Sequence, residues 1–304
     1  MIHFLRALSC LLASLLALVT ASPTLAQDAG WKLEPDARIE VQTVSAQTTT
    51  RDDDLVVDGE AISVRAQLGL ALNSESTRFR LEADRIEVFR LGGGRNDISR
   101  DRLTATVQHD VTKSLEVQLQ ARRYDDLVTV ESADSDEWQG SARVTFEPTR
   151  DNRFRVAATW RDRQYDNGAD PATTGEGPRI DAQYRRRLGP NHFVAFDLRA
   201  ENIRSDDPDR GFERESAGVA YTRPVVKDLR VRPAIELIKT RFDGRLTDTG
   251  ALRRDRQVVP EVELLWWPGK WRIEAEAKYV FFNSNEAVRE REGYRLTLSV
   301  GYAF

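Results

Sequence analysis

Arginine side chains alternate with apolar side chains along much of this chain, and they have the clearest potential for chemistry. Only six of the 45 basic residues are lysines, so arginine supplies nearly all of the positive charge. In residues 153–163, for example, Arg153 and Arg155 alternate with Phe154 and Val156. A guanidinium group forms two-pronged hydrogen bonds with carboxylates and with other oxyanions. The pattern therefore predicts either a paired charge network or a surface that favours anions.

The polar positions of the alternating segments define a candidate polar surface. Its arginines are Arg65, Arg102, Arg122, Arg143, Arg153, Arg155, Arg161, Arg179, Arg185, Arg187, Arg199, Arg214, Arg230, Arg232, Arg272 and Arg295. Its carboxylates include Glu116, Asp181, Asp197, Glu201, Glu236, Glu261, Glu263, Glu274 and Glu276. Two neighbouring segments are expected to form a basic ladder from Arg153, Arg155, Arg161, Arg179, Arg185 and Arg187.

Other residue types indicate chemistry less clearly. His109 and His192 lie beside expected short turns, away from any place where a Ser–His pair would be useful, and His3 lies in the amino-terminal segment. The glycines at 92–94 open no expected helix, so they indicate a turn and not a phosphate-binding loop. Asp clusters such as 52–54 could bind divalent cations, but solvated loop residues explain them better. We therefore expect no enzymatic activity, no cofactor and no metal site.

Strands must position the polar surface, because alternation with a period of two is the signature of a strand with two unlike faces. Eleven residues at roughly 3.3 Å each, tilted by about 40°, rise roughly 28 Å, which matches the apolar band of an outer membrane. Fourteen segments alternate: 37–49, 61–73, 76–91, 101–110, 114–124, 137–147, 153–163, 178–188, 192–203, 212–223, 228–241, 256–267, 271–281 and 294–304.

Three places break the regular pattern. The phase of 76–91 slips near Asp84 and Arg85, which predicts a β-bulge that realigns the two faces. Pro233 and Pro260 each remove a backbone donor, so their strands need a bulge or a local break in the ladder.

The carboxyl-terminal segment is the most regular of all. Its apolar residues alternate with Arg295, Thr297, Ser299, Gly301 and Ala303, and the chain stops on Phe304. This ending resembles the assembly signal of Gram-negative outer-membrane β-barrel proteins, carried here by Tyr294, Leu296, Leu298, Val300, Gly301, Tyr302 and Phe304. The resemblance covers only this last segment. It implies an antiparallel transmembrane barrel. The alternating segments put the strand number at about fourteen, within a range of roughly twelve to sixteen.

The amino terminus predicts export. Residues 1–26 combine Arg6, a short apolar run at 11–19 and a small-residue exit before Gln27, which is typical of a secretory signal peptide. Cys10 precedes most of that run, so a lipoprotein anchor does not fit. We expect a signal peptide at 1–26, a short periplasmic segment at 27–36 and the barrel at 37–304. Removing Arg6 with the signal changes the formal net charge from −4 to −5.

Connections and aromatic residues agree with a membrane barrel. Short joints alternate with longer polar ones, and short turns are expected in the periplasm. Aromatic residues are typical of both membrane interfaces. We expect Phe154, Trp266, Trp271, Tyr302 and Phe304 near the periplasmic boundary, and Trp138, Trp160, Tyr279, Phe281 and Tyr294 near the outer boundary. A soluble all-β sandwich or barrel is the alternative, because alternation alone does not say which face is inside.

These expectations favour a porin-like channel for passive diffusion of small hydrophilic solutes, including anions. Fourteen strands leave a water-filled lumen, and no connection is long enough to make a large plug. The alternatives are a barrel within a polysaccharide or surface-protein export or assembly machine, and a closed structural barrel. Expected partners are outer-membrane lipid, lipopolysaccharide and the barrel assembly machinery, while the near-neutral charge argues against nucleic acid. The transported solute and the oligomeric state stay open.

Overall fold

A computed structural model describes residues 30–46, 59–91, 97–132, 134–166, 168–169 and 171–304. The expected signal peptide lies outside these residues. The strands are β1 (Lys32–Ala46), β2 (Gly59–Asn73), β3 (Thr77–Leu91), β4 (Ile98–Thr112), β5 (Leu115–Asp125), β6 (Ser135–Thr149), β7 (Asn152–Tyr165), β8 (Thr174–Gly189), β9 (His192–Ser205), β10 (Phe212–Val226), β11 (Leu229–Leu246), β12 (Leu252–Trp266), β13 (Trp271–Ser284) and β14 (Arg291–Ala303). One 3-10 turn, η1, covers Ala287–Arg289.

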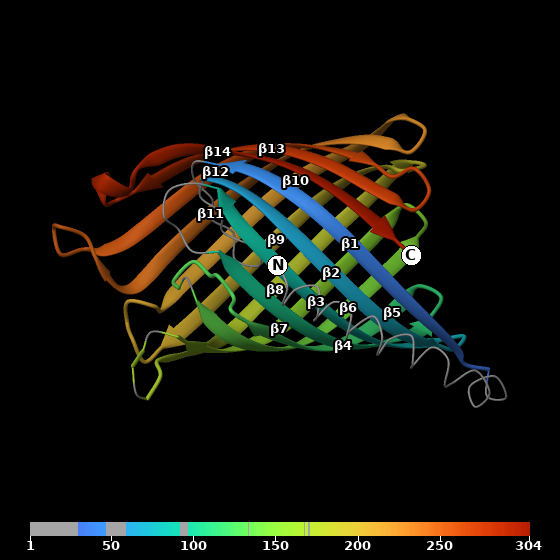
Figure 1. The fold of residues 1–304 in the computed structure, drawn as a ribbon, viewed down its shortest axis with the longest axis horizontal. Helices are drawn as coiled ribbons and strands as arrows, with labels where there is room; N and C mark the ends of the chain where they lie inside the picture. Colours follow the sequence, from blue (N-terminus) through green and yellow to red (C-terminus); the bar gives the residue numbers. More distant parts are fainter. Residues whose placement is uncertain (1–29, 47–58, 92–96, 133, 167, 170) are drawn as a thin grey trace.

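The strands form a closed antiparallel barrel in which each strand pairs with its neighbours in sequence (Figure 1). The barrel closes where β1 pairs with β14, from Arg38 opposite Ala303 to Ala46 opposite Arg295. The predicted fold and strand number are therefore confirmed. The first strand begins at Lys32, earlier than position 37. Within the described residues, no helix has the length and apolarity needed to span a membrane.

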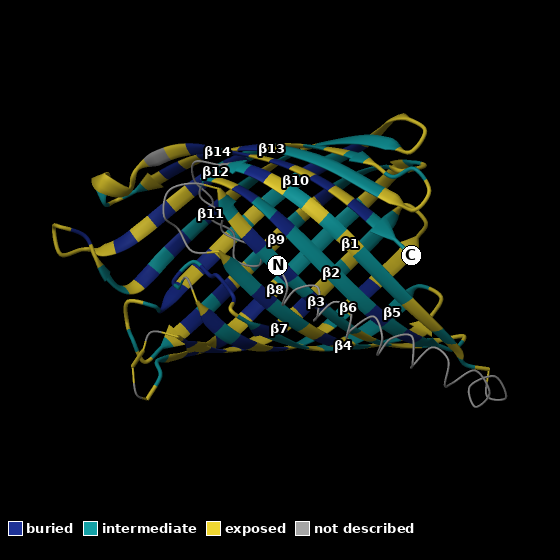
Figure 2. Cartoon of the chain, in the orientation of Figure 1, coloured by how far each residue is buried: buried dark blue, intermediate teal, exposed yellow. Residues whose placement is uncertain are grey.

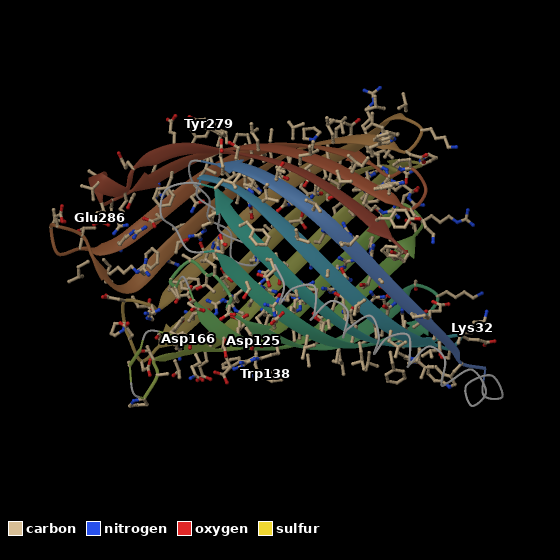
Figure 3. All side chains as sticks on the ribbon, in the orientation of Figure 1. Lys32, Asp125, Trp138, Asp166, Tyr279 and Glu286 are labelled. Carbon is tan, nitrogen blue, oxygen red and sulfur yellow. The ribbon has the colours of Figure 1, made fainter. Side chains whose placement is uncertain are left out.

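The two ends of the barrel differ. The short-turn end carries the tight turns, the start of β1 and the end of β14, with Lys32 close to it (Figure 3). The long-loop end carries Asp166 and Glu286 (Figure 3). Asn191 and Asp228 in the short turns have φ values of 52° and 64°, a region that Asn and Asp tolerate better than most residues. This turn chemistry explains why these connections are so short.

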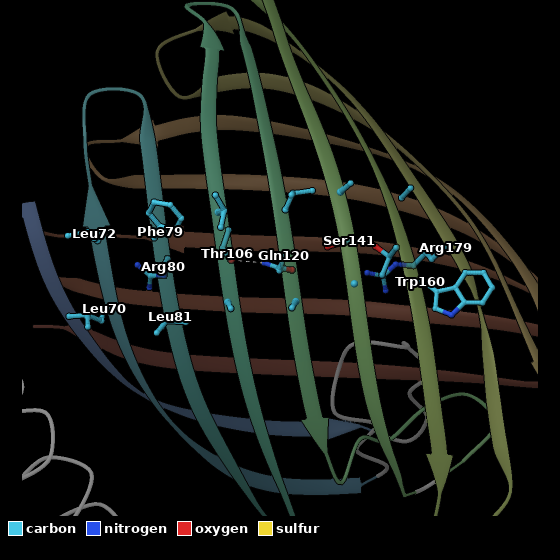
Figure 4. Close-up of a pocket in the computed structure, with 18 of the residues that line it drawn as sticks. Leu70, Leu72, Phe79, Arg80, Leu81, Thr106, Gln120, Ser141, Trp160 and Arg179 are labelled. Carbon is cyan, nitrogen blue, oxygen red and sulfur yellow. Dashed lines mark hydrogen bonds between the residues drawn. The ribbon is translucent and has the colours of Figure 1, made fainter. Parts of the chain in front are cut away.

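Buried and exposed positions alternate along the strands (Figure 2), and the apolar and polar faces separate as the alternation predicted. On β7, Val156 and Trp160 are exposed, whereas Arg161 and Arg163 are almost completely buried. A hollow of about 1080 Å³ along β2–β8 is lined mainly by outward apolar side chains (Figure 4). The polar side chains therefore fill the interior, and the apolar side chains form the outer surface.

The predicted bulge in β3 is absent. The register between β2 and β3 runs unbroken from Glu60 opposite Leu91 to Asn73 opposite Arg78. Instead, the inward positions of the strand change from charged to apolar: Ile86 and Val88 point inward and are 5% and 1% exposed. They pack with Val44 and Ala61, and this interior apolar cluster takes the place of the expected realignment. Consequently the charged residues beside them on the strand point outward. Arg85 forms ion pairs with Glu87 at 2.6 Å and with Asp101 at 3.1 Å.

The prolines cause local breaks and not bulges. The β10–β11 ladder loses its pairs around Pro233 and then resumes in the same register. The β12–β13 ladder does the same around Pro260. A third break lies in the β8–β9 ladder around Pro178, where a Cβ on Gly177 would stand only 1.9 Å from the Asn202 carbonyl oxygen. Proline cannot donate to a ladder, so each break falls on one side of its strand.

Candidate functional site

The interior wall is built mostly from triads in which one carboxylate lies between two arginines. On β2–β4, Asp84 accepts from Arg102 and from Arg65, whose Nη2 lies 3.4 Å away. The same network continues through Glu82 and Arg80, and Arg80 Nη1 lies 2.8 Å from Asp36. Fully paired charges of this kind hold side chains against the wall. The predicted residues Arg65 and Arg102 therefore have structural partners.

Two further triads involve strands β7–β10. Glu201 lies between Arg161 at 3.0 Å and Arg214 at 3.5 Å, and all three side chains are buried. Asp181 accepts from Arg179 at 3.1 Å. It also accepts from Arg199 at 2.7 Å. The predicted basic ladder is therefore divided: Arg161 and Arg179 are neutralised by carboxylates and do not belong with its other members.

Residues 126–132 of the loop between β5 and β6 fold into the barrel at the long-loop end. Val130 packs against Ile203, Phe212 and Phe242, which project inward from β9, β10 and β11. Leu127 is 1% exposed. The loop is too short to be a large plug, but it reaches the far side of the interior. We name it the inward loop.

Buried charges hold the inward loop in place. Glu131 of the loop accepts hydrogen bonds from Arg163 and from the Tyr165 hydroxyl at 3.0 Å. Arg163 also bonds to Glu137 on β6, and Arg245 donates to the Glu131 carbonyl oxygen at 3.2 Å. The sequence analysis missed this site. A signal was present, because Leu127, Val128 and Val130 are apolar residues in a connection that was expected to be polar and exposed.

Four arginines on β6–β8 lack the carboxylate that completes the other groups. We call Arg143, Arg153, Arg155 and Arg185 the arginine cluster. Arg153 lies directly opposite Arg185 in the β7–β8 register. Arg153 pairs with Glu147 at 3.2 Å, and Arg143 donates to Gln118 at 3.3 Å.

The remaining members of the cluster have fewer polar contacts. The Arg155 side chain forms no hydrogen bond or ion pair with any residue that the structure describes. Arg185 stacks on the Phe193 ring. The predicted residue Arg187 follows Arg185 on β8, and Arg122 donates to the Tyr124 hydroxyl at 2.8 Å. The cluster is therefore the least compensated positive region among the described parts of the interior.

Carboxylates lie beside lysine and arginine on another part of the wall, β11–β13. Carboxylate oxygens of Glu261, Glu263 and Glu276 lie within 4.8 Å of one another. Lys278 lies 2.9 Å from Glu276 and 3.7 Å from Glu261, and Arg232 lies 2.8 Å from Glu263. The protein's own cations thus occupy the position that a divalent ion would take.

The other predicted residues of this wall are Glu236, Glu274, Arg230, Arg272 and Arg295. Arg295 lies 4.0 Å from Glu276, and Glu236 is on β11. The Trp267 indole donates to Glu274 at 2.9 Å, and the guanidinium groups of Arg230 and Arg272 lie over its ring. These contacts hold the side chains near the short-turn end.

A second acidic group lies outside the strands' polar face at the long-loop end. Carboxylate oxygens of Asp126, Asp136 and Asp166 lie within 4.8 Å of one another. Burial, followed by the charges of Asp134 and Asp136, raises the pKa of Asp126 above its ordinary value. Asp136 accepts from Arg123, which stacks on Trp138.

The carboxyl-terminal strand and the two described histidines have simple contacts. Leu296 and Leu298 are half exposed on the outer surface, and the Phe304 backbone donates to the Ala37 carbonyl at 2.9 Å. Tyr302 contacts both Trp271 and Phe304 at the short-turn end. His109 bonds to Thr77 and His192 bonds to Tyr221.

Comparisons with known proteins support the barrel. No protein-family model and no curated protein matches the chain in sequence. A loop-deletion mutant of OmpT, an outer membrane protein of Vibrio cholerae, matches with a TM-score of 0.56 and 9% identity over 90% of this chain and all of that one. The intact protein in its trimer form matches at 0.53, with 10% identity over 90% of this chain and 100% of that one.

A bacterial polysaccharide outer membrane secretin matches at 0.50, with 9% identity over 89% of this chain and 98% of that one. The chain has the fold of Gram-negative outer-membrane β-barrel proteins. At these identities the likeness establishes the fold alone.

Proposed function

We propose that this outer-membrane barrel is a channel for passive diffusion of small hydrophilic solutes, with a preference for anions. The observation that carries the proposal is the arginine cluster. Elsewhere the described interior arginines mostly have a carboxylate within ion-pair distance, which offsets part of their field. At the cluster, neighbouring guanidinium groups add their fields in a confined polar space, which attracts anions and repels cations.

Conductance of the purified protein in a planar bilayer tests this proposal. We expect discrete steps and a reversal potential that indicates anion selectivity in a salt gradient. The double variant Arg153→Glu, Arg185→Glu should change the preference toward cations, because it replaces two facing positive charges with negative ones. An absence of stepwise conductance would contradict the proposal.

A closed structural barrel is the second candidate, and the inward loop is the observation that favours it. Its buried apolar and charged contacts narrow the interior at the long-loop end. Deletion of residues 127–132 distinguishes the two candidates. A channel already open should gain conductance on deletion, whereas a closed barrel should conduct only after the loop is removed.

A further inference from the structure

The geometry points to a discrete binding site at the arginine cluster for a compact oxyanion that carries at least two negative charges. The inference deepens the proposed channel function and rests on it for the route by which the ligand arrives. It differs from general anion selectivity because a discrete site saturates and distinguishes divalent from monovalent anions.

The wall itself provides the first argument. Three triads place a carboxylate between two arginines, and their central residues are Asp84, Asp181 and Glu201. The arginine cluster repeats the arginines without that central carboxylate. Among the described residues, Glu147 forms an ion pair with Arg153 alone. Glu116 is engaged by Gln108 and Thr145, at 2.9 and 3.4 Å. An oxyanion from solution would occupy the position that a carboxylate has in the other three groups.

The second argument is the free-energy cost of leaving the space between the cluster's arginines without an anion. Like charges directly opposite each other on neighbouring strands destabilise a sheet, and Arg153 faces Arg185 in this way. The Nε atoms of Arg143 and Arg155 are also buried without a hydrogen-bond acceptor among the described residues, as are those of Arg38 and Arg65 elsewhere on the wall. Buried donors without acceptors carry a desolvation penalty. A bound anion relieves the repulsion between the guanidinium groups, whose exposed edges offer several donors in a fork geometry.

Position in the barrel is the third argument. Arg153 is the second residue of β7, and Arg185 lies four residues before the end of β8. The cluster is therefore near the short-turn end, whereas the inward loop is anchored at the long-loop end by Arg163 and Tyr165. An anion reaches the cluster from the short-turn end without passing the inward loop.

Sulfate is a suitable probe because it keeps two charges throughout the usable pH range. Binding is measured by isothermal titration on the purified full-length protein in detergent, at constant ionic strength set by chloride. We expect saturable binding of one sulfate. Arg155→Gln should raise the dissociation constant at least about tenfold, because it removes a charged donor of the site. Arg38→Gln is the matched control: Arg38 projects into the interior from β1 but pairs with Glu40 at 2.6 Å, so sulfate affinity should change less than about twofold.

The melting temperature distinguishes a variant that has lost the binding site from one that has lost the fold. Removing one of the mutually repelling charges should leave the melting temperature without sulfate unchanged or higher, while sulfate should no longer raise it. If Arg155→Gln does not fold, Arg153→Gln serves the same purpose. Equal sulfate affinity in wild type, Arg155→Gln and Arg38→Gln would overturn the site. Conductance without sulfate binding would refute this site and leave the channel proposal intact, whereas sulfate binding without conductance would refute the channel and support the site.

Discussion

Strand β7 carries both extremes of arginine chemistry in this barrel. Near the long-loop end, Arg161 and Arg163 are 0% and 1% exposed and are neutralised by buried carboxylates. Near the short-turn end, Arg153 and Arg155 lie among other arginines. The residue type and the spacing are the same in both regions. The difference shows that the neighbouring carboxylates, and not the arginine itself, decide whether the side chain is held in an ion pair.

The largest difference between the two regions should appear when Arg163 is removed. Arg163→Met leaves Glu131 and Glu137 buried without their cation, which should destabilise the barrel by about 3–5 kcal/mol. Arg155→Met should be neutral or stabilising, because it removes a repelling charge. Urea unfolding in detergent, followed by tryptophan fluorescence, measures both variants. Equal destabilisation by the two substitutions would remove the distinction between the regions.

Charge reversal should have the next largest effect. Arg153→Glu with Arg185→Glu should change the ratio of anion to cation permeability at least about tenfold, because it reverses the field of the confined region. The matched pair is Arg161→Gln with Glu201→Gln, which removes a neutral buried pair and should change the ratio little. Reversal potentials in a salt gradient measure both. A similar change in both double variants would mean that selectivity arises elsewhere.

The anchor of the inward loop provides a third test, at the long-loop end of β7. Tyr165→Phe removes a hydroxyl that donates to Glu131 at 3.0 Å, while keeping the ring that Arg210 covers. The expected loss of unfolding free energy is about 1–3 kcal/mol, because the acceptor is charged and buried. Tyr184→Phe, whose hydroxyl bonds to Asn152 on the outer face, is the control and should cost less. The same urea experiment applies.

The smallest expected effect concerns pH. The raised pKa of Asp126 means that the folded state holds its proton at higher pH than the unfolded state does. Stability should therefore decline as pH rises from the ordinary carboxyl pKa of 3.8 toward neutrality. Asp126→Asn should raise the melting temperature at pH 7 by at most about 2 °C, because the group is largely exposed. Below pH 3.8 the gain should disappear, and a gain that persists there would point to a cause other than charge.

Local periodicity explains which parts of the fold could be predicted. All fourteen strands follow from a period of two, because the alternation of faces is a property of each strand alone. The inward position of the triads around Asp181 and Glu201 also follows from it. The reversal at Ile86 and Val88 could not be predicted in this way, because a buried apolar interior depends on Val44 and Ala61 from two other strands.

The candidate site was predicted only in outline. Arg153, Arg155 and Arg185 were expected to lie together because their two segments are neighbours along the chain. Their separation from Arg161 depends on Glu201, which reaches Arg161 only after β7, β8 and β9 have paired. The inward loop depends on contacts with β9–β11, far along the chain. Such contacts require the register of the whole barrel, which a single strand does not contain.

The three breaks in backbone pairing divide the ring of fourteen strands into two arcs. From β13 through β14 and β1 to β8, hydrogen-bonded ladders run without a gap in mid-strand, whereas the breaks around Pro178, Pro233 and Pro260 all lie between β8 and β13. We expect the second arc to deform more easily than the first, since backbone pairs are missing from three of its ladders. The inward loop spans from β5 and β6 on the first arc to β9–β11 on the second. We therefore expect its contacts to limit how far the cross-section of the barrel can change at that end.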